Sequence, residues 1–338
     1  MKQVQIVGAD KIAVVEVEKP TFGSNDILVK MKAVGICGSD TFYTHVGGIP
    51  PLQGHTPLGH EPAGEVEGVG ENIKDVQVGN HIVINSMAFE DGILGSGGLQ
   101  GGFANYVIIT NAKANKQFRV IPNEIPWKVA ALNEPMAVAH HAVNRSGAKA
   151  GDKAVVFGAG PIGLGALLSL KSKGVGHIVV VDILTDRLEK ALSIGADAVI
   201  NSAKEDVFER LKDLQGVGYQ AIPRDERAGT DVYIDAAGVP VVTETILKMV
   251  KHKAVLTVVA VHKKPVSIDF GDLLTSEVDI RLSMGYPNEI FEVTDSIIAN
   301  WEKYSQIISD ELPFDKVLTA LKLAATPGAA EKVVVTFE

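Results

Sequence analysis

Cysteine is nearly absent from this chain, since Cys37 is the only one among 338 residues. No disulfide can therefore form within the chain, which fits a reducing compartment. No stretch approaches the ~18 consecutive apolar residues of a membrane helix. The first 20 residues alternate apolar and polar side chains instead of forming the apolar core of a signal peptide. We therefore expect a cytoplasmic protein with no membrane partner.

An excess of positive charge is lacking as well. The 32 Lys and Arg residues are outnumbered by 41 Asp and Glu, so the formal net charge is −9, which argues against a nucleic-acid partner. The composition is otherwise that of a globular protein, with 46% hydrophobic and 22% charged residues. A chain of this length exceeds what one hydrophobic core usually serves, and it predicts two domains.

Two patterns of secondary structure divide the chain. Up to about residue 110, short runs rich in Val and Ile are separated by Gly, Pro and Asn, which predicts a β-rich region. From residue 151, apolar strands alternate with helices that end at glycines, which predicts a doubly wound parallel sheet of six strands. Residues 215–229 are interpreted as a solvated loop. The strand expected at 332–337 is placed to pair back with the first region.

These patterns predict an α/β protein in which the nucleotide-binding domain is an insertion. We expect one domain formed by residues 1–147 and 286–338. The dinucleotide-binding domain is expected at residues 148–285.

A glycine-rich turn follows the strand expected at 153–157. Gly158 permits the tight turn, Gly160 lets a pyrophosphate approach the backbone, and Gly163 allows close packing of helix on strand. Pro161 and Ile162 complete the motif and open the helix, whose free N–H groups favour an anion. The structural alternative is a glycine turn with no ligand.

Asp182 ends the next expected strand and predicts NAD rather than NADP. A carboxylate there accepts both ribose hydroxyls and repels a 2′-phosphate. No arginine follows directly, and Arg187 is placed to brace the ribose or the adenine. The alternative for Asp182 is a helix-capping role.

Cys37, His60 and Glu61 combine the donor types of a catalytic zinc site that keeps one position open. Taken alone, a single cysteine is more often a buried structural residue, and a histidine often simply packs. Glu134 is a second carboxylate, at the start of an expected helix, where its alternative role is to stabilise the helix N-terminus.

Together these motifs resemble the zinc-dependent medium-chain dehydrogenase/reductase (alcohol dehydrogenase) superfamily, and most of all its sorbitol, butanediol and threonine dehydrogenase branch. The resemblance implies a GroES-like catalytic domain and a Rossmann nucleotide domain. The matching segments span nearly the whole chain and comprise residues 35–40, 59–64 with Gly68 and Gly70, 101–107, 133–135 and 158–163.

The resemblance implies roles for individual residues. Cys37, His60 and a glutamate would bind catalytic zinc, with the choice between Glu61 and Glu134 left open. Ser39 would take the proton of the substrate. Asp40 would orient the residues that hold the metal.

The sequence departs from the family pattern in two places. Residues 86–101, where many relatives carry four cysteines for a structural zinc, contain none, so we expect one zinc per chain. Phe42 stands where relatives often have a histidine that passes the proton to solvent. His45 is a candidate substitute, and its alternative is a plain surface histidine.

The implied reaction is oxidation of a secondary alcohol or vicinal diol to the ketone, with hydride transfer to NAD. Phe42 and Tyr43 favour a short diol over a long polyol, while L-threonine and sorbitol-type polyols stay open as alternatives. The alternative functions from other classes are a zinc-free, NADPH-dependent reductase and a non-catalytic NAD(H)-binding or crystallin-like protein.

The resemblance also implies a homodimer or homotetramer assembled through the nucleotide-domain sheet, including residues 254–260 and 279–284.

Overall fold

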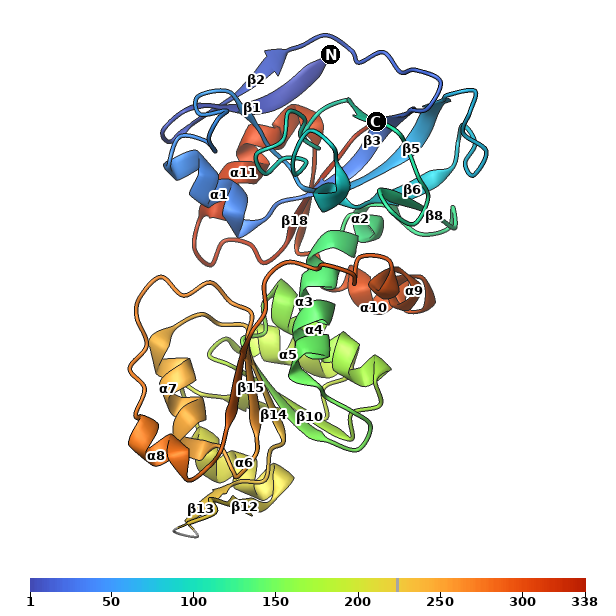
Figure 1. Ribbon diagram of the computed structural model, residues 1–338. Helices are drawn as coiled ribbons and strands as arrows, with labels where there is room; N and C mark the ends of the chain where they lie inside the picture. The colour runs from blue at the N-terminus through green and yellow to red at the C-terminus, as the bar shows by residue number, and fades with distance from the viewer. Residues whose placement is uncertain (223–224) are drawn as a thin grey trace. The chain divides into compact units, whose positions relative to one another are not determined.

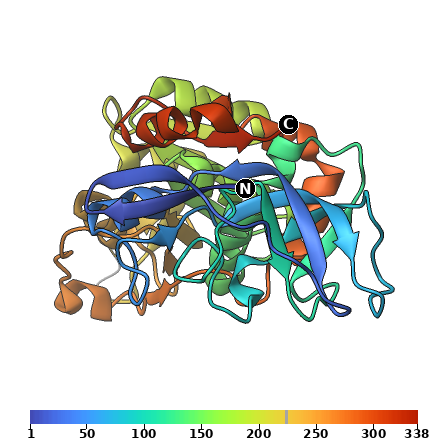
Figure 2. The same ribbon diagram turned by 90° about the horizontal axis from the view of Figure 1, so that it is seen from above.

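The computed structural model describes residues 1–222 and 225–338. The chain divides into two compact units, one formed by residues 1–134 and 297–338 and the other by residues 135–296. Both labelled ends of the chain lie in the first unit (Figures 1 and 2). No helix within the described ranges combines the length and the apolar character needed to cross a membrane.

The first unit is β-rich, as predicted from its short Val- and Ile-rich runs. Its main sheet has the order β17-β18-β3-β5-β6-β8, with β7 also paired to β3, and a smaller sheet has the order β2-β1-β4. The strands of the main sheet are β3 (Ile27–Gly35), β5 (Glu61–Val69), β6 (His81–Ile84), β7 (Tyr106–Ile109), β8 (Phe118–Ile121), β17 (Asp310–Pro313) and β18 (Val333–Thr336). Those of the smaller sheet are β1 (Lys2–Gly8), β2 (Lys11–Glu16) and β4 (Thr56–Pro57).

Pairing between distant segments closes this unit. Strand β18 runs antiparallel to β3, with Val335 opposite Val34, which confirms that the last strand pairs back with the first region. The helical elements are α1 (Gly38–His45), η1 (Ser86–Ala88), α2 (Trp127–Ala130), α10 (Trp301–Ser305), η2 (Phe314–Lys316) and α11 (Val317–Ala325). The core is lined by fully buried side chains such as Met31, Ile82 and Phe103.

The second unit holds the predicted six-stranded parallel sheet, in the order β11-β10-β9-β14-β15-β16 (Figure 1). The chain order reverses between β9 and β14, and such a switch point is where dinucleotides bind in this architecture. The strands are β9 (Lys153–Phe157), β10 (His177–Asp182), β11 (Ala198–Asn201), β14 (Val232–Asp235), β15 (Val255–Val258) and β16 (Asp279–Leu282). The helices are α3 (Asn133–Ser146), α4 (Pro161–Ser172), α5 (Thr185–Ile194), α6 (Val207–Gln215), α7 (Pro240–Met249), α8 (Phe270–Leu274) and, across the unit limit, α9 (Glu292–Ala299).

The interpretation of residues 215–229 as a loop was wrong for two segments. Strands β12 (Val217–Tyr219) and β13 (Glu226–Ala228) form an antiparallel pair with Gly218 opposite Arg227. Buried Gln220 donates to the carboxylate of Asp272 at 3.1 Å, so the pair is anchored to α8. Tertiary contacts thus outweigh the polar composition. Residues 223–224 of the predicted loop lie outside the described residues.

The unit limits differ from the predicted domain limits because α3 and residues 286–296 join the second unit. His141 on α3 lies 2.8 Å from Glu289, and Asn144 donates to the same carboxylate at 3.3 Å. Close packing also joins α3 to the second unit. Gly165 of α4 lies so near α3 that an added Cβ would meet Met136 and Ala139.

Replacing Glu289 with glutamine is expected to destabilise the second unit in a pH-dependent way. Burial alone would raise the pKa of Glu289, but hydrogen bonds from His141, Asn144 and the N–H of Asn288 hold that pKa below its usual range. A depressed carboxyl pKa contributes stability above the unfolded pKa of about 4.3, and this stability is lost as the pH falls through the folded pKa. We expect Glu289→Gln to cost about 1–3 kcal/mol at pH 7. Thermal unfolding should show the difference from the parent chain fading below about pH 4, and an equal loss at every pH would contradict this explanation.

Candidate functional site

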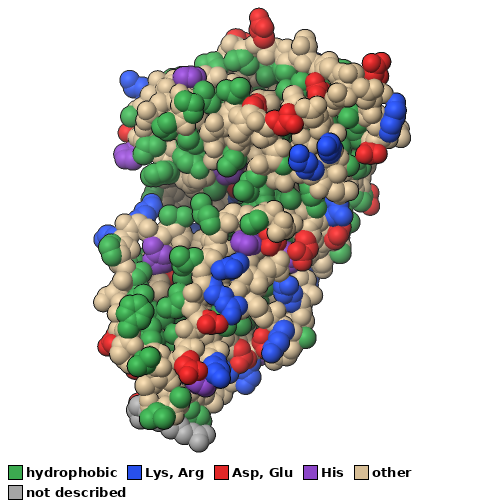
Figure 3. Space-filling view, viewed as in Figure 1, with side chains coloured by type: hydrophobic (Ala, Val, Ile, Leu, Met, Phe, Trp, Pro, Cys, Tyr) green, Lys and Arg blue, Asp and Glu red, His purple; other side chains and the backbone are tan. Residues whose placement is uncertain are grey.

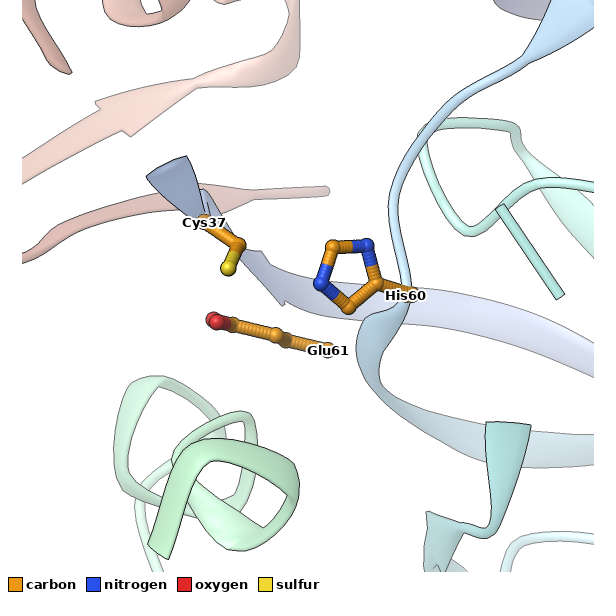
Figure 4. Close-up of side chains that lie close together, drawn as sticks. All are labelled: Cys37, His60 and Glu61. Atoms are coloured by element: carbon orange, nitrogen blue, oxygen red, sulfur yellow. The ribbon is translucent and has the colours of Figure 1, made fainter. Parts of the chain in front are cut away.

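Cys37, His60 and Glu61 converge where two neighbouring strands meet. Gly35 at the end of β3 lies opposite Glu61 at the start of β5, so the residues that follow Gly35 and precede Glu61 lie close together. One ligand atom from each of the three residues lies within 4.8 Å of the others. Figure 4 shows the three side chains pointing toward one another. A thiol, an imidazole and a carboxylate in this arrangement match the donor set of a catalytic zinc.

Two glycines make room for this cluster. A Cβ on Gly35 would overlap Oε2 of Glu61. Gly59 has a φ of +94°, and a Cβ there would meet the backbone of Phe103. Gly59 tolerates both the close approach and the positive φ, and at Gly35 the missing side chain leaves room for the Glu61 carboxylate. The glycines of the sequence motif therefore have a steric reason that is local to the cluster.

Asp40 contacts two members of the cluster, Cys37 and His60. Its side chain is fully buried on α1, and Oδ2 accepts the N–H of Cys37 at 2.9 Å. Oδ1 lies 3.4 Å from Nδ1 of His60. Burial alone would lower the pKa of His60, but Asp40 and Cys37 raise that pKa well above its usual range. The predicted orienting role of Asp40 is compatible with these contacts.

Ser39 and the aromatic residues that follow it lie on α1. The Ser39 hydroxyl is 3.3 Å from Nε2 of His60, the ring nitrogen on the side away from Asp40. Phe42 is 61% exposed, and the hydroxyl of Tyr43 accepts a hydrogen bond from Ser96 at 2.8 Å. The role of Ser39 in proton transfer stays a prediction.

His45 lies at the far end of α1 from Ser39. Its Nδ1 is 3.0 Å from Oδ1 of Asp10, and both side chains are largely exposed. This placement matches a plain surface histidine, the alternative to a relay role.

The two candidate glutamates differ in their placement. Glu61 joins Cys37 and His60, whereas Glu134, in the first turn of α3, is not part of that group among the described residues. Glu134 is 9% exposed, and its carboxylate lies near enough to Lys332 to raise the pKa of that lysine. Which of the two glutamates binds the metal stays a prediction.

Sequence reasoning missed Lys332, which lies directly beside the cluster. Its ammonium forms an ion pair with Oε2 of Glu61 and donates to the carbonyl of Ile36 at 3.1 Å. Burial alone would lower the pKa of Lys332, but Glu61 and Cys37 raise it. The only signal in the sequence is a lysine bordering an apolar strand. The pairing partner is 271 residues away, so no local pattern reveals it.

The predicted glycine turn joins β9 to the N-terminus of α4. Gly158 has a φ of +95°, and a Cβ on Gly163 would overlap the carbonyl oxygen of Gly158. Gly160 is the N-cap residue, with Pro161 and Ile162 opening the helix, and a Cβ there would meet no atom within 4 Å. The free N–H groups of α4 therefore face an open space suited to an anion.

Asp182 lies at the carboxyl end of β10, beside this turn. Its Oδ2 accepts the N–H of Ala159 at 2.7 Å. Its Oδ1 accepts the N–H groups of Ile183 and Leu184 at 2.7 and 2.9 Å. Arg187 lies 3.9 Å away. The carboxylate therefore braces the glycine turn and also bonds the backbone that leads into α5, as the capping alternative expects.

Both halves of the chain match known families. The alcohol dehydrogenase GroES-like domain matches residues 23–120. The zinc-binding dehydrogenase family matches residues 161–299. The two matches fall on the regions predicted to be β-rich and doubly wound.

Named relatives cover nearly the whole chain. (R,R)-butanediol dehydrogenase of Bacillus subtilis is 31% identical over 91% of this chain and 89% of its own. Sorbitol dehydrogenase of Bombyx mori is 27% identical over 97% and 96% of the two chains. The crystal structure of 2R,3R-butanediol dehydrogenase from Bacillus subtilis superimposes with a TM-score of 0.85 at 27% identity, over 99% of each chain. The chain therefore belongs to the zinc-dependent medium-chain dehydrogenase/reductase (alcohol dehydrogenase) superfamily.

Proposed function

We propose that this dehydrogenase oxidises a secondary alcohol or vicinal diol to the ketone, reversibly, with one zinc ion and NAD. The observation that carries the proposal is the convergence of Cys37, His60 and Glu61 in a chain that also has a complete dinucleotide turn. Zinc in such a site supplies a Lewis acid that lowers the pKa of an alcohol oxygen. The butanediol and sorbitol dehydrogenases among its relatives support the substrate class.

Individual residues would bind the metal, orient its ligands and accept the proton of the substrate. Cys37, His60 and Glu61 hold the metal, with Glu134 as the alternative third ligand. Asp40 accepts the N–H of Cys37 and, from 3.4 Å away, would orient the His60 ring. Ser39, beside Nε2 of His60, receives the proton of the alcohol. We propose one zinc per chain, because the only cysteine is already committed to this cluster.

The substrate is tested by following NADH formation over a panel of short diols, hexitols, simple secondary alcohols and L-threonine, each repeated after chelation. We expect chelator-sensitive turnover that is fastest on a short diol such as 2,3-butanediol. A clear preference for hexitols or for threonine would reject the short-diol proposal. Binding of NADH with no turnover on any substrate would favour a non-catalytic protein.

Changing Asp182 to serine is expected to weaken the preference for NAD. In the proposed role, the Asp182 carboxylate would accept the ribose hydroxyls and repel a 2′-phosphate. Removing the charge should raise the ratio of kcat/KM for NADP to that for NAD by about tenfold or more, because a hydrogen bond to a charged group contributes about 1.5–3 kcal/mol. Asp182→Glu is the matched control, since it keeps the charge. An unchanged ratio in Asp182→Ser would mean that Asp182 serves only the turn.

We also propose a homo-oligomer that forms through the outer edge of the second unit's sheet. Strand β16 is the last strand in the sheet order, and Leu282 and Met284 are 71% and 86% exposed. Figure 3 shows further hydrophobic side chains over α7 and α8, where Val241, Phe270 and Leu274 are exposed. An unpaired edge strand with exposed apolar side chains beside it is a template for pairing with a second chain. The one cysteine must stay reduced to hold a metal, which supports the proposed cytoplasmic location.

Replacing Leu282 with lysine is expected to shift the protein toward monomers. A buried lysine at a strand edge is costly, and edge lysines are a common natural block to strand pairing. Light scattering coupled to size exclusion measures the mass directly. Leu318→Lys, at an exposed position on α11 in the first unit, is the control and should leave the mass unchanged. A Leu282→Lys variant with the parent's oligomeric mass would place the interface elsewhere.

A further inference from the structure

Lys332 is a buried cation built into the candidate metal cluster. The residue is 4% exposed, and its partner Glu61 is 1% exposed. Its place is set by backbone pairing, because Val333 accepts the N–H of Ile36 at 3.0 Å. This bond brings the start of β18 beside the segment that carries Cys37. The ammonium then reaches Oε2 of Glu61 and the Ile36 carbonyl.

This contact balances the charge of Glu61 within the protein itself. Asp40 instead accepts the N–H of Cys37 and lies 3.4 Å from Nδ1 of His60. Within the part of the chain that the structure describes, the Glu61 carboxylate pairs with Lys332. A divalent cation held by Cys37, His60 and Glu61 therefore lies beside a positive charge that already uses one oxygen of Glu61.

We propose that Lys332 is an internal competitor of the metal, which compensates Glu61 when the metal is absent and so lowers the affinity of the site for zinc. The inference rests on the proposed function, because it takes Cys37, His60 and Glu61 as the zinc ligands. Removing one partner of a buried ion pair leaves an uncompensated charge that destabilises the fold. A bound cation relieves that cost, so its affinity rises by linkage.

The test is the zinc affinity of metal-depleted Lys332→Met, measured by competition with a chromogenic chelator. We expect zinc to bind at least tenfold more tightly than in the parent chain, a change of about 1.4 kcal/mol. We also expect a lower Tm without zinc and a larger rise in Tm when zinc is added. Unchanged or weaker zinc binding by Lys332→Met would overturn the proposal.

Two further variants distinguish loss of the Lys332 charge from a general destabilisation of the fold. Lys32→Met breaks a lysine–glutamate pair with Glu65 in the same sheet, 3.2 Å long and outside the cluster, and should leave zinc affinity unchanged. Lys332→Arg keeps the charge and should bind zinc within about threefold of the parent. A tenfold gain in either variant would contradict the competition.

A double-variant cycle tests whether the effect passes through Glu61. In a Glu61→Gln background there is no carboxylate to compete for, so adding Lys332→Met should change zinc affinity by less than about threefold. The double variant also buries a neutral pair, which keeps the test available if Lys332→Met alone does not fold. A full tenfold gain in this background would overturn the proposal.

Failure of the proposed function gives a different result. In that case the parent chain itself would bind no zinc, or would bind it equally well after Cys37→Ser. Stoichiometric zinc binding that depends on Cys37, together with unchanged affinity in Lys332→Met, would instead reject the competitor role alone.

Discussion

Replacing Cys37 with alanine is expected to abolish zinc binding and to lower kcat/KM for alcohol oxidation by about a thousandfold, since metal Lewis-acid catalysis supplies several kcal/mol. Cys37 carries the only thiol of the chain, and no other residue can replace it as a thiolate ligand. The side chain is small and only partly buried. The fold should therefore survive the change, and the loss should be confined to metal and activity.

Metal content by mass spectrometry and steady-state rates on the same samples check this expectation. His45→Ala is the matched control, because His45 ends the helix that Cys37 caps but pairs with Asp10 at the surface. It should keep both its zinc and its rate. Full zinc content and full rate in Cys37→Ala would refute the proposed centre, and a large loss in His45→Ala would restore its candidacy as a proton relay.

Replacing Gly160 with alanine is expected to impair NAD binding while leaving the fold intact. Gly160 has a φ of −77°, which any residue adopts, and an added Cβ meets no protein atom within 4 Å. The methyl group instead occupies the open space above the N-terminus of α4, where the pyrophosphate is proposed to lie. Overpacking of this kind costs about 1–3 kcal/mol, which corresponds to a rise of about 5-fold to 150-fold in the Kd for NADH.

Fluorescence titration with NADH and thermal unfolding distinguish the two effects. Gly163→Ala is the informative contrast, because its Cβ would overlap the carbonyl of Gly158 within the protein. That variant should lose Tm, whereas Gly160→Ala should not. An unchanged Kd in Gly160→Ala would place the dinucleotide away from this turn.

Local patterns in the sequence were sufficient for much of the fold. The six-stranded parallel sheet followed from apolar strands alternating with glycine-ended helices, because periodicity and helix stops are read over short windows. The positions of Gly158, Gly160 and Asp182 followed in the same way, since a strand, its turn and the next helix are contiguous. The residues 215–229 were misread because the β12–β13 pair depends on contacts with α8, which lies more than 40 residues further along the chain.

The sequence by itself determined the donor types available to a metal and the architecture that carries a dinucleotide. Only the tertiary structure decided that Glu61 rather than Glu134 is grouped with Cys37 and His60, and that Lys332 is buried against Glu61. The physical reason is that strand register sets these contacts. The pairing of β3 with β5 and with β18 joins residues far apart in the chain. The return of the last strand to the first region was predicted, but a short sequence window contains no signal for the register of these strands.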